Sequence, residues 1–322
     1  LNKGKTMSFA TKLTEGAFKN INFDFIGKRK RFYILSSIII LLGVGSLVTK
    51  GLSYGVDFDG GRTYVVRFDE TVDNEALRVA LKKVFTDTEP QVKTFGADNQ
   101  VKITTSFMID IKKITTDSIV ESKLSEGLST AEVDYEIMSS QKVGPTIAED
   151  IKDAAVWSVV FSLLVIFLYI LVRFRKWQFS LGAVAAVFHD VLIVLSIFSV
   201  LYGVLPFSLE IDQAFIAAIL TIIGYSLNDT VVVFDRVREY MNDNKKKGVH
   251  ELINGALNST LSRTINTSLT TFCVLLIIFL FGGEVIRGFM FALMVGVVVG
   301  TYSSLFVASP IMMDTINKKE EK

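Results

Sequence analysis

The sequence predicts an α-helical membrane protein with six transmembrane helices and one small α+β domain outside the membrane. Half of the 322 residues are hydrophobic, only four are proline, and the mean hydropathy is positive; soluble domains rarely have this composition. Six apolar runs are long enough, or nearly so, to cross a hydrocarbon core of about 30 Å as helices. Between the first and second runs lie roughly a hundred mostly polar residues, enough for a separate domain.

The six expected spans follow the apolar runs in chain order. A helix needs about 20 apolar residues to cross the membrane, because all of its backbone groups must be hydrogen-bonded internally there. The first and fifth runs are the shortest. The expected spans are residues 32–49, 154–172, 179–205, 213–234, 266–281 and 285–308.

The basic residues indicate the orientation of the helices, because Lys and Arg near membrane ends are retained in the cytoplasm. The run from Lys28 to Arg31 places the N-terminal segment 1–31 in the cytoplasm. With six helices, the basic stretch 236–247 and the C-terminal tail 309–322 fall on the same side. The two short loops on the opposite side contain no Lys or Arg. These loops are residues 206–212 and 282–284.

Residues 50–153 then form a small α+β domain on the outer, extracytoplasmic side. Apolar residues alternate with polar ones from Tyr64 to Phe68, as in a half-buried strand, whereas those from Ala76 to Phe85 follow helical spacing. The whole segment predicts the element order βαββαβ, a ferredoxin-like pattern. The expected elements are strand 64–68, helix 76–85, strands 91–95 and 101–105, helix 109–128 and strand 133–137.

The segment between the fourth and fifth spans, residues 235–265, is expected to be a cytoplasmic loop that contains an amphipathic helix. Apolar residues recur at helical spacing from Val249 to Leu261, beside the basic stretch. Such a helix can lie on the membrane surface, in contact with lipids, or pack under the helix bundle. The spacing does not separate these two interpretations.

Polar residues interrupt the apolar fourth span at Asn228, Asp229 and Thr230. A carboxylate at this depth costs about 2.5 to 3.5 kcal/mol, so its default interpretation is a functional group that faces the bundle interior. Burial disfavours the charged form of a carboxyl group and a nearby cation favours it, and a group balanced between the two effects can take up and release a proton. Asp229 is therefore the primary candidate for a proton-carrying residue.

Arg263 is the expected partner of this carboxylate. Asp229 lies only about 10 Å from the end of its span near Phe234, at 1.5 Å per residue, and Arg263 enters the next span at similar depth. We expect the two side chains to pair in one state and to separate in another. The alternative is a permanent ion pair that only fixes helix packing.

A second polar pair, His189 and Asp190, lies near the middle of the third span. Imidazole titrates near neutral pH, so the pair could relay protons. It could equally form a hydrogen-bonded knot that holds helices together. The sequence leaves both possibilities open.

Two further patterns concern backbone geometry. Asp57, Gly60 and Gly61 belong to a turn that leads from the first span into a strand, and turn chemistry alone assigns no function to them. In the sixth span, small residues recur every fourth position from Ala292 to Ser304, which allows another helix to approach closely. That helix could belong to this chain or to a partner half.

Several classes of function lack support. The two histidines, His189 and His250, stand in unrelated contexts, so no metal site is expected. The single cysteine, Cys273, lies in an apolar run and cannot form an intrachain disulfide. There is no GxxxxGK[ST] phosphate loop and no serine or cysteine nucleophile motif, so we expect neither a cofactor nor an enzyme activity. The near-zero net charge argues against nucleic-acid binding.

Four motifs together resemble the SecF family of protein-export membrane proteins. The resemblance covers nearly the whole chain from about Asn22. The single short outer domain fits SecF better than the related SecD, whose outer region is larger. The family's first motif usually has threonine where this chain has Asp59. The motifs are Asp57 to Gly61, Val143 to Pro145, His189 with Asp190, and Gly224 to Thr230.

This resemblance implies an RND-type half, since the family belongs to the resistance-nodulation-division superfamily, in which two six-helix halves pair. Protons there pass through carboxylates in the fourth span of each half. Asp229 matches that position, with Asn228 and Thr230 beside it in the motif. Arg263 matches the residue expected to respond to the proton.

The resemblance also implies partners and a location. The partners would be SecD, as a separate chain or a fused half, the SecYEG translocon, and unfolded preproteins. The protein would lie in the bacterial cytoplasmic (inner) membrane, with protons as the coupling ion, and would draw preproteins out on the outer face. Two other functions compete: one half of an RND-type exporter of small molecules or lipids, and a translocon assembly scaffold that conducts no protons.

The beginning of the chain gives one further expectation. The sequence starts at Leu1, and Met7 could be a start. The first residues resemble a hydrophilic linker, which favours a fragment cut from a longer fused protein.

Overall fold

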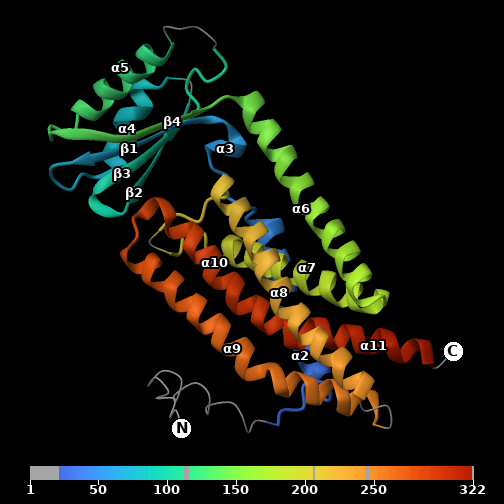
Figure 1. The fold of residues 1–322 in the computed structure, drawn as a ribbon. Coiled ribbons are helices and arrows are strands. Elements are labelled where there is room, and N and C mark those ends of the chain that lie inside the picture. Colours follow the sequence, from blue (N-terminus) through green and yellow to red (C-terminus); the bar gives the residue numbers. More distant parts are fainter. Residues whose placement is uncertain (1–21, 87, 112–115, 206, 244–246, 321–322) are drawn as a thin grey trace, which may run out of the picture.

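The structure is a computed structural model that describes residues 22–86, 88–111, 116–205, 207–243 and 247–320 (Figure 1). Its six long helices form a bundle, and a small α+β domain stands at one end (Figure 1). We call this end of the bundle the domain end and the opposite end the far end. The expected start or linker before Asn22 and the side chains of the basic tail at Lys318 and Lys319 lie outside the described residues.

The α+β domain has the expected ferredoxin-like order. Its four strands form an antiparallel sheet in the order β2-β3-β1-β4. The two helices pack on one face of this sheet, where Phe68, Leu81 and Leu124 belong to the domain's own apolar core. The elements are α3 (Val56–Asp59), β1 (Gly61–Phe68), α4 (Asn74–Val84), β2 (Gln91–Phe95), β3 (Ala97–Thr105), α5 (Thr116–Ser129) and β4 (Tyr135–Val143).

Three of the four strands extend beyond the expected residues, whereas β2 has the expected bounds. β3 begins at Ala97 rather than at residue 101, because polar residues such as Gln100 pair with β1 opposite Arg67. Gly96, with φ of 87°, makes the turn between β2 and β3. β4 extends to Val143, and most of its residues are exposed. An edge strand of this kind carries no alternation that a sequence pattern could detect.

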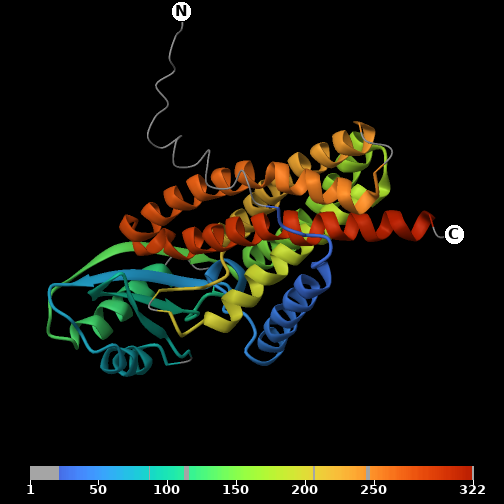
Figure 2. The same ribbon diagram turned by 90° about the horizontal axis from the view of Figure 1, so that it is seen from below.

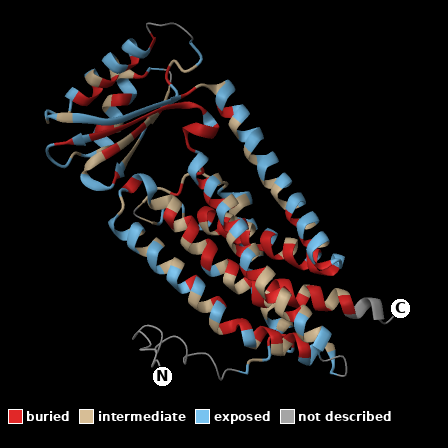
Figure 3. Ribbon diagram, viewed as in Figure 1, coloured by how far each residue is buried: buried red, intermediate tan, exposed pale blue. Residues whose placement is uncertain are grey.

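The six expected membrane helices are all present, each long and apolar enough to cross a membrane. α7, α8 and α10 carry most of the buried residues and form the centre of the bundle, whereas α2, α6 and α9 are largely exposed (Figure 3). In Figure 2, α2 and α9 lie on opposite sides of the bundle. The helices are α2 (Arg29–Thr49), α6 (Pro145–Phe174), α7 (Trp177–Leu201), α8 (Gln213–Asp243), α9 (Val249–Phe281) and α10 (Glu284–Ser303).

Several helices continue beyond the expected spans. α6 begins at Pro145, nine residues before the expected start of the second span, because proline is favoured at the first position of a helix. The α+β domain therefore ends at Gly144 instead of residue 153. At the other end of the chain, α10 passes through a π-helix, η1 (Ser304–Ala308), into α11 (Ser309–Glu320). Residues 309–320 of the tail are therefore helical.

Residues 235–265, which were expected to form a loop that contains an amphipathic helix, are helical over most of their length. α8 runs on to Asp243, and the amphipathic segment forms the first turns of α9 rather than a separate helix. Its apolar residues Ile253, Ala256 and Leu257 are fully buried in the core of the bundle. No proline interrupts residues 249–281, and the apolar face of the first turns packs under the bundle. The interpretation as a helix packed under the bundle is therefore confirmed, and the alternative of a surface-lying helix is wrong.

The small-residue stripe of the sixth span packs within this chain. Ala292, Gly296 and Gly300 are buried. A Cβ atom on Gly296 would collide with Ile222 of α8, and one on Gly300 would lie 3.0 Å from the Cβ of Ser226. The stripe therefore brings α10 close to α8, the helix that carries Asp229.

We expect Gly296→Leu to destabilise the bundle by about 1 to 3 kcal/mol, because the larger side chain overpacks the contact between α10 and α8. Thermal unfolding in detergent measures the effect. Gly45→Leu is the matched control, because a Cβ there meets nothing within 4 Å. Equal melting temperatures for the two variants would contradict the close approach of the helices.

Candidate functional site

Asp229 lies inside the bundle on α8 and is 5% exposed. Its Oδ2 accepts a hydrogen bond of 3.3 Å from the Ser268 hydroxyl of α9. Ser268 in turn accepts a bond of 2.6 Å from Thr301 of α10, and the Tyr225 hydroxyl lies 3.5 Å from it. The Asp229 carboxylate accepts no other hydrogen bond from the described residues. Asp229 is therefore a buried acid held by hydroxyl groups.

Arg263 does not pair with Asp229 in this structure, which therefore corresponds to the separated state of the two expected for this pair. No ion pair of Arg263 occurs within 4.0 Å in the described part of the chain, and its side chain is exposed. The reason is helical geometry. Ser268, which reaches Asp229, follows Arg263 by five residues, and five residues turn an α-helix by about 140° beyond a full turn. The two side chains therefore point in different directions from α9.

Arg263 instead lines an open cleft of about 510 Å³ at the far end of the bundle. Asp235 of α8 lies in the same cleft and pairs with Arg173 at 2.9 Å and with Arg238 at 2.9 Å. Glu239 also lines this cleft, which is therefore rich in both charges. The cleft lies one to two helical turns from Asp229 along α8.

The two neighbours of Asp229 in the sequence motif face different surroundings. Asn228 is exposed on the surface of the bundle, because successive residues of a helix are rotated by about 100°. Thr230 is fully buried, and its hydroxyl donates to the Ser304 hydroxyl at 3.2 Å, at the first residue of η1. The structure brings neither side chain into contact with the Asp229 carboxylate among the described hydrogen bonds.

His189 and Asp190 form a buried polar knot. Asp190 is 1% exposed. Its Oδ2 accepts hydrogen bonds from Ser226 at 2.6 Å and Ser303 at 2.8 Å, and its Oδ1 lies 3.0 Å from Nδ1 of His189. Nε2 of His189 lies 3.0 Å from the Ser36 hydroxyl of α2. The pair therefore ties together α2, α7, α8 and α10.

The two intramembrane acids differ in how well they are satisfied. Asp190 has three partners within 3.0 Å, whereas Asp229 has one at 3.3 Å. A buried carboxylate with few hydrogen bonds is the less stable as an anion. Of the two acids, Asp229 has the geometry of a group that can change its protonation state, and Asp190 that of a helix connector.

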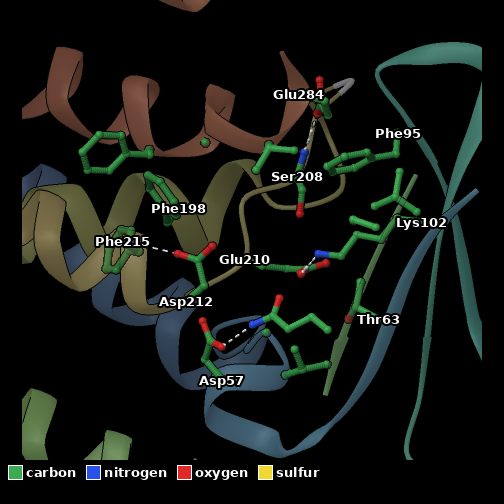
Figure 4. Close-up of a pocket in the computed structure, with 18 residues that line it drawn as sticks. Asp57, Thr63, Phe95, Lys102, Phe198, Ser208, Glu210, Asp212, Phe215 and Glu284 are labelled. Atoms are coloured by element: carbon green, nitrogen blue, oxygen red, sulfur yellow. Dashed lines mark hydrogen bonds and ion pairs between the residues drawn. The ribbon is translucent and has the colours of Figure 1, made fainter. Parts of the chain in front are cut away.

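At the domain end, the turn motif forms the one-turn helix α3. Gly60 and Gly61 have φ values of 72° and 140°, which favour glycine. Asp57 is buried, and its Oδ1 accepts from Nε2 of Gln141 at 2.8 Å (Figure 4). Its Oδ2 accepts from the backbone N–H of Gln213 at 3.0 Å. The outer turn thus contacts both the sheet and the bundle.

Glu210 was missed at the level of sequence. This residue of the loop between α7 and α8 pairs with Lys102 of β3 at 2.5 Å (Figure 4). It also pairs with Lys93 of β2 at 3.4 Å. Burial raises the pKa of the Glu210 carboxyl, but the attraction and hydrogen bonds of Lys102 and Lys93 outweigh burial and hold the pKa below its usual value. The ion pair fastens the sheet to the bundle. The signal available in the sequence was an acidic residue in a loop that contains no Lys or Arg and could therefore pair with a base elsewhere in the chain.

We expect Glu210→Gln to loosen the sheet from the bundle, with about 1 to 2 kcal/mol less protection of β2 in hydrogen exchange. Because the folded pKa of Glu210 is lowered, its contribution is present above the ordinary glutamate value of about 4.3 and is lost as pH falls through the folded pKa. The wild type should therefore lose protection in acid, and the variant should lack it at every pH.

Glu89→Gln is the matched control for this prediction. Glu89 also has a lowered pKa, caused first by its hydrogen bond with Lys82, but it pairs with Lys82 and Arg78 inside the α+β domain. This variant should leave the protection of β2 unchanged. Protection in Glu210→Gln equal to that of the wild type would contradict the role of the ion pair.

Comparison with known proteins gives consistent matches. The family model of the C-terminal region of the protein-export membrane proteins SecD and SecF matches residues 123–318, and that of the SecD/SecF GG motif matches residues 45–72. The protein translocase subunit SecF of Rhodothermus marinus is 52% identical over 92% of this chain and 94% of its own length. The SecF of Haemophilus influenzae is 36% identical over 92% of this chain and 87% of its own length.

A solved structure is also similar. The crystal structure of SecDF from Thermus thermophilus, described as a translocon-associated membrane protein, superposes with a TM-score of 0.78 at 32% identity. The match covers 96% of this chain and 41% of the SecDF chain. The chain therefore spans about two fifths of the length of that solved protein.

Proposed function

Because the chain belongs to the SecF family of protein translocase subunits, we propose that it uses the proton gradient, together with a SecD half, to promote preprotein translocation. In this proposal the subunit works beside the SecYEG translocon and helps to release unfolded preproteins on the outer face of the membrane. It acts through movement, with the proton as its coupling ion and without covalent chemistry or a further cofactor.

The observation that carries this proposal is the placement of Asp229. A buried acid with a single weak hydrogen bond, between hydroxyl groups and a charged cleft, is suited to gain and lose a proton. Arg263 lines that cleft and supplies a positive charge that a shift of α9 against α8 can bring closer. A proton that crosses about 100 mV releases about 2.3 kcal/mol, enough to bias a rearrangement of a few kcal/mol.

The charges at the two ends support an orientation. The far end carries Arg173, Arg236 and Arg238 around the cleft, and such basic ends face the cytoplasm. The α+β domain then lies on the extracytoplasmic side of the bacterial cytoplasmic (inner) membrane, with both termini in the cytoplasm. Protons would enter from the domain end, reach Asp229, and leave through the cleft beside Arg263.

The exposed face of α8 supports a partner half. Thr221, Gly224 and Asn228 form an exposed stripe of small and polar residues on this helix, next to the buried Asp229. An amide such as that of Asn228 is poorly suited to contact lipid tails. We infer that a SecD half covers this stripe, either as a separate chain or as part of a fused protein.

The reading of His189 and Asp190 as a proton relay has less support. Both ring nitrogens of His189 and both carboxylate oxygens of Asp190 already have hydrogen-bond partners. None of the described hydrogen bonds connects the pair to Asp229. We propose that they hold the helices in register, and that proton transfer is confined to Asp229.

The experiment that tests this function measures preprotein translocation into inverted membrane vesicles that contain the SecD partner and SecYEG. We expect the chain to increase the yield of translocated preprotein, and an ionophore that collapses the proton gradient to remove the increase. A scaffold would keep its effect in the presence of ionophore. An RND-type exporter would leave translocation unchanged and drive efflux of small molecules or lipids instead.

A further inference from the structure

We propose that Asp57 is the residue that transmits movement of α8 to the α+β domain. This inference rests on the proposed proton-driven function and deepens it, because it names the contact through which a change at Asp229 reaches the outer domain. Asp57 would act as a positioning residue. It binds no proton and no substrate in this account.

The Asp57 carboxylate joins three separate segments of the chain. It belongs to α3, which follows the first membrane helix. Its Oδ1 accepts a hydrogen bond of 2.8 Å from Gln141 of β4 (Figure 4). Its Oδ2 accepts one of 3.0 Å from the backbone N–H of Gln213, the first residue of α8. Both oxygens are thus engaged, one by the sheet and one by the bundle. The side chain is only 9% exposed.

The first turn of α8 is held tightly to the segment around Asp57. Asp212 caps the helix, since its Oδ1 accepts from the N–H of Phe215 at 2.7 Å. Ile211 exchanges backbone hydrogen bonds with the strand-like segment before α3: its N–H donates to Ser53 at 2.8 Å, and its carbonyl accepts from Gly55 at 2.9 Å. A negative carboxylate is also favoured at this end of a helix by the helix dipole. Movement of α8 along its axis therefore acts directly on Asp57.

α8 can carry such a movement over a long distance. The helix is continuous from Gln213 to Asp243 and contains no proline. Asp229 follows Gln213 by sixteen residues, or about 24 Å at 1.5 Å per residue. Sharp kinks in helices arise mainly at proline, so α8 has no proline kink that would absorb a displacement along its axis. A change of packing around Asp229 would therefore arrive at the contact between Gln213 and Asp57.

The two glycines of the motif explain how Asp57 reaches both partners. A Cβ on Gly60 would lie 3.4 Å from the Cα of Pro145, and one on Gly61 would lie 3.1 Å from the carbonyl oxygen of Thr105. Their positive φ values turn the chain from α3 straight into β1. This places α3 between the sheet, the start of α6 and the start of α8. The motif therefore builds a junction between the two parts of the molecule.

The experiment compares proton flux with preprotein export in the same vesicles, with the SecD partner present. Asp57→Ala removes both hydrogen bonds. Gln213→Pro removes the α8 bond from the other side, because proline lacks the N–H but is well tolerated at the first position of a helix. For both variants we expect flux within about twofold of the wild type and gradient-dependent export reduced at least about tenfold.

Two further variants serve as controls. Asp59→Ala changes the other acid of the same turn, which is exposed and has no side-chain hydrogen bond among the described residues, and should retain both flux and export. Asp57→Asn should restore part of the export lost in Asp57→Ala. Its carboxamide can accept from the N–H of Gln213 and donate to the amide oxygen of Gln141 once that side chain flips.

The outcomes separate the inference from the function on which it rests. If Asp57→Ala and Gln213→Pro retain export while Asp229→Asn loses flux and export, the coupling role of Asp57 is wrong and the proton-driven function stands. If the Asp57 variants lose flux and export together, the residue is not a coupling element. If Asp229→Asn retains gradient-dependent export, the proposed function itself is wrong.

Discussion

Asp229→Asn is expected to abolish proton flux and to reduce gradient-dependent preprotein export at least about tenfold, without loss of the fold. Asparagine has nearly the same shape and still accepts the hydrogen bond of the Ser268 hydroxyl, but it cannot take up or release a proton. The expected effect is large because the acid has no substitute. The other fully intramembrane acid of the described chain, Asp190, lies in a separate hydrogen-bond network.

Flux is measured as the gradient-dependent loss of protons from the acidified lumen of inverted vesicles that contain the SecD partner, and export as the yield of protease-protected preprotein. Asp59→Asn is the matched control, because it makes the same change at an exposed acid outside the bundle. Its flux should survive if the subunits still pair, which co-purification with SecD checks. Normal flux in Asp229→Asn would contradict the assignment.

Asp190→Ala is expected to destabilise the bundle by about 2 to 4 kcal/mol. The change leaves the hydroxyls of Ser226 and Ser303 and the imidazole of His189 without their common partner in a buried site. Hydrogen bonds between membrane helices are individually worth about 0.6 to 2 kcal/mol, and the two from Ser226 and Ser303 are lost together with the contact to His189 within α7. Four helices meet at this knot, so the damage extends beyond one contact.

Asp190→Asn separates a helix connector from a proton relay. Its oxygen can accept from both serines, and its amide can donate to Nδ1 of a neutral His189 whose Nε2–H faces Ser36. We expect melting temperature and export close to those of the wild type for Asp190→Asn, and a clearly lower melting temperature for Asp190→Ala. Loss of flux in a stable Asp190→Asn variant would show that the pair conducts protons.

The architecture was predictable from the sequence because it depends on local patterns. Membrane helices appear as apolar runs of sufficient length, and the order of strands and helices in the outer domain follows from alternation and helical spacing. The helix boundaries that the sequence predicted incorrectly have physical explanations. Residues 145–153 are polar yet helical, since α6 extends beyond the membrane towards the sheet. Residues 249–265 look separate from the fifth span because polar residues such as Asn258 and Arg263 interrupt the apolar pattern, yet α9 continues through them.

The candidate site was predictable in part. A carboxylate in the fourth span required an explanation, and Asp229 indeed lies inside the bundle. Its hydrogen-bond partner in this structure, Ser268, was not predictable. The sequence indicates how deep a residue lies in the membrane, but it does not indicate the rotation of a helix about its axis. Five residues on α9 separate Ser268, which contacts the acid, from Arg263, which faces the cleft. For the same reason Asn228 points out of the bundle although it adjoins Asp229.

The contacts at the domain end depend on pairs far apart in the chain. Asp57 meets Gln213, and Lys102 meets Glu210, each across more than a hundred residues. No local pattern encodes such pairs. These contacts form only once the sheet packs against the loop between α7 and α8. The local turn chemistry therefore assigned no role to Asp57.

The proposed proton-driven function depends most directly on a proton that binds to and leaves the Asp229 carboxyl. Infrared difference spectra of the SecD-paired protein, recorded between acidic and alkaline conditions, detect the carbonyl band of a protonated buried carboxyl group. We predict a band that appears on acidification, is absent from Asp229→Asn and persists in Asp190→Asn. A band that remains unchanged in Asp229→Asn would contradict the account.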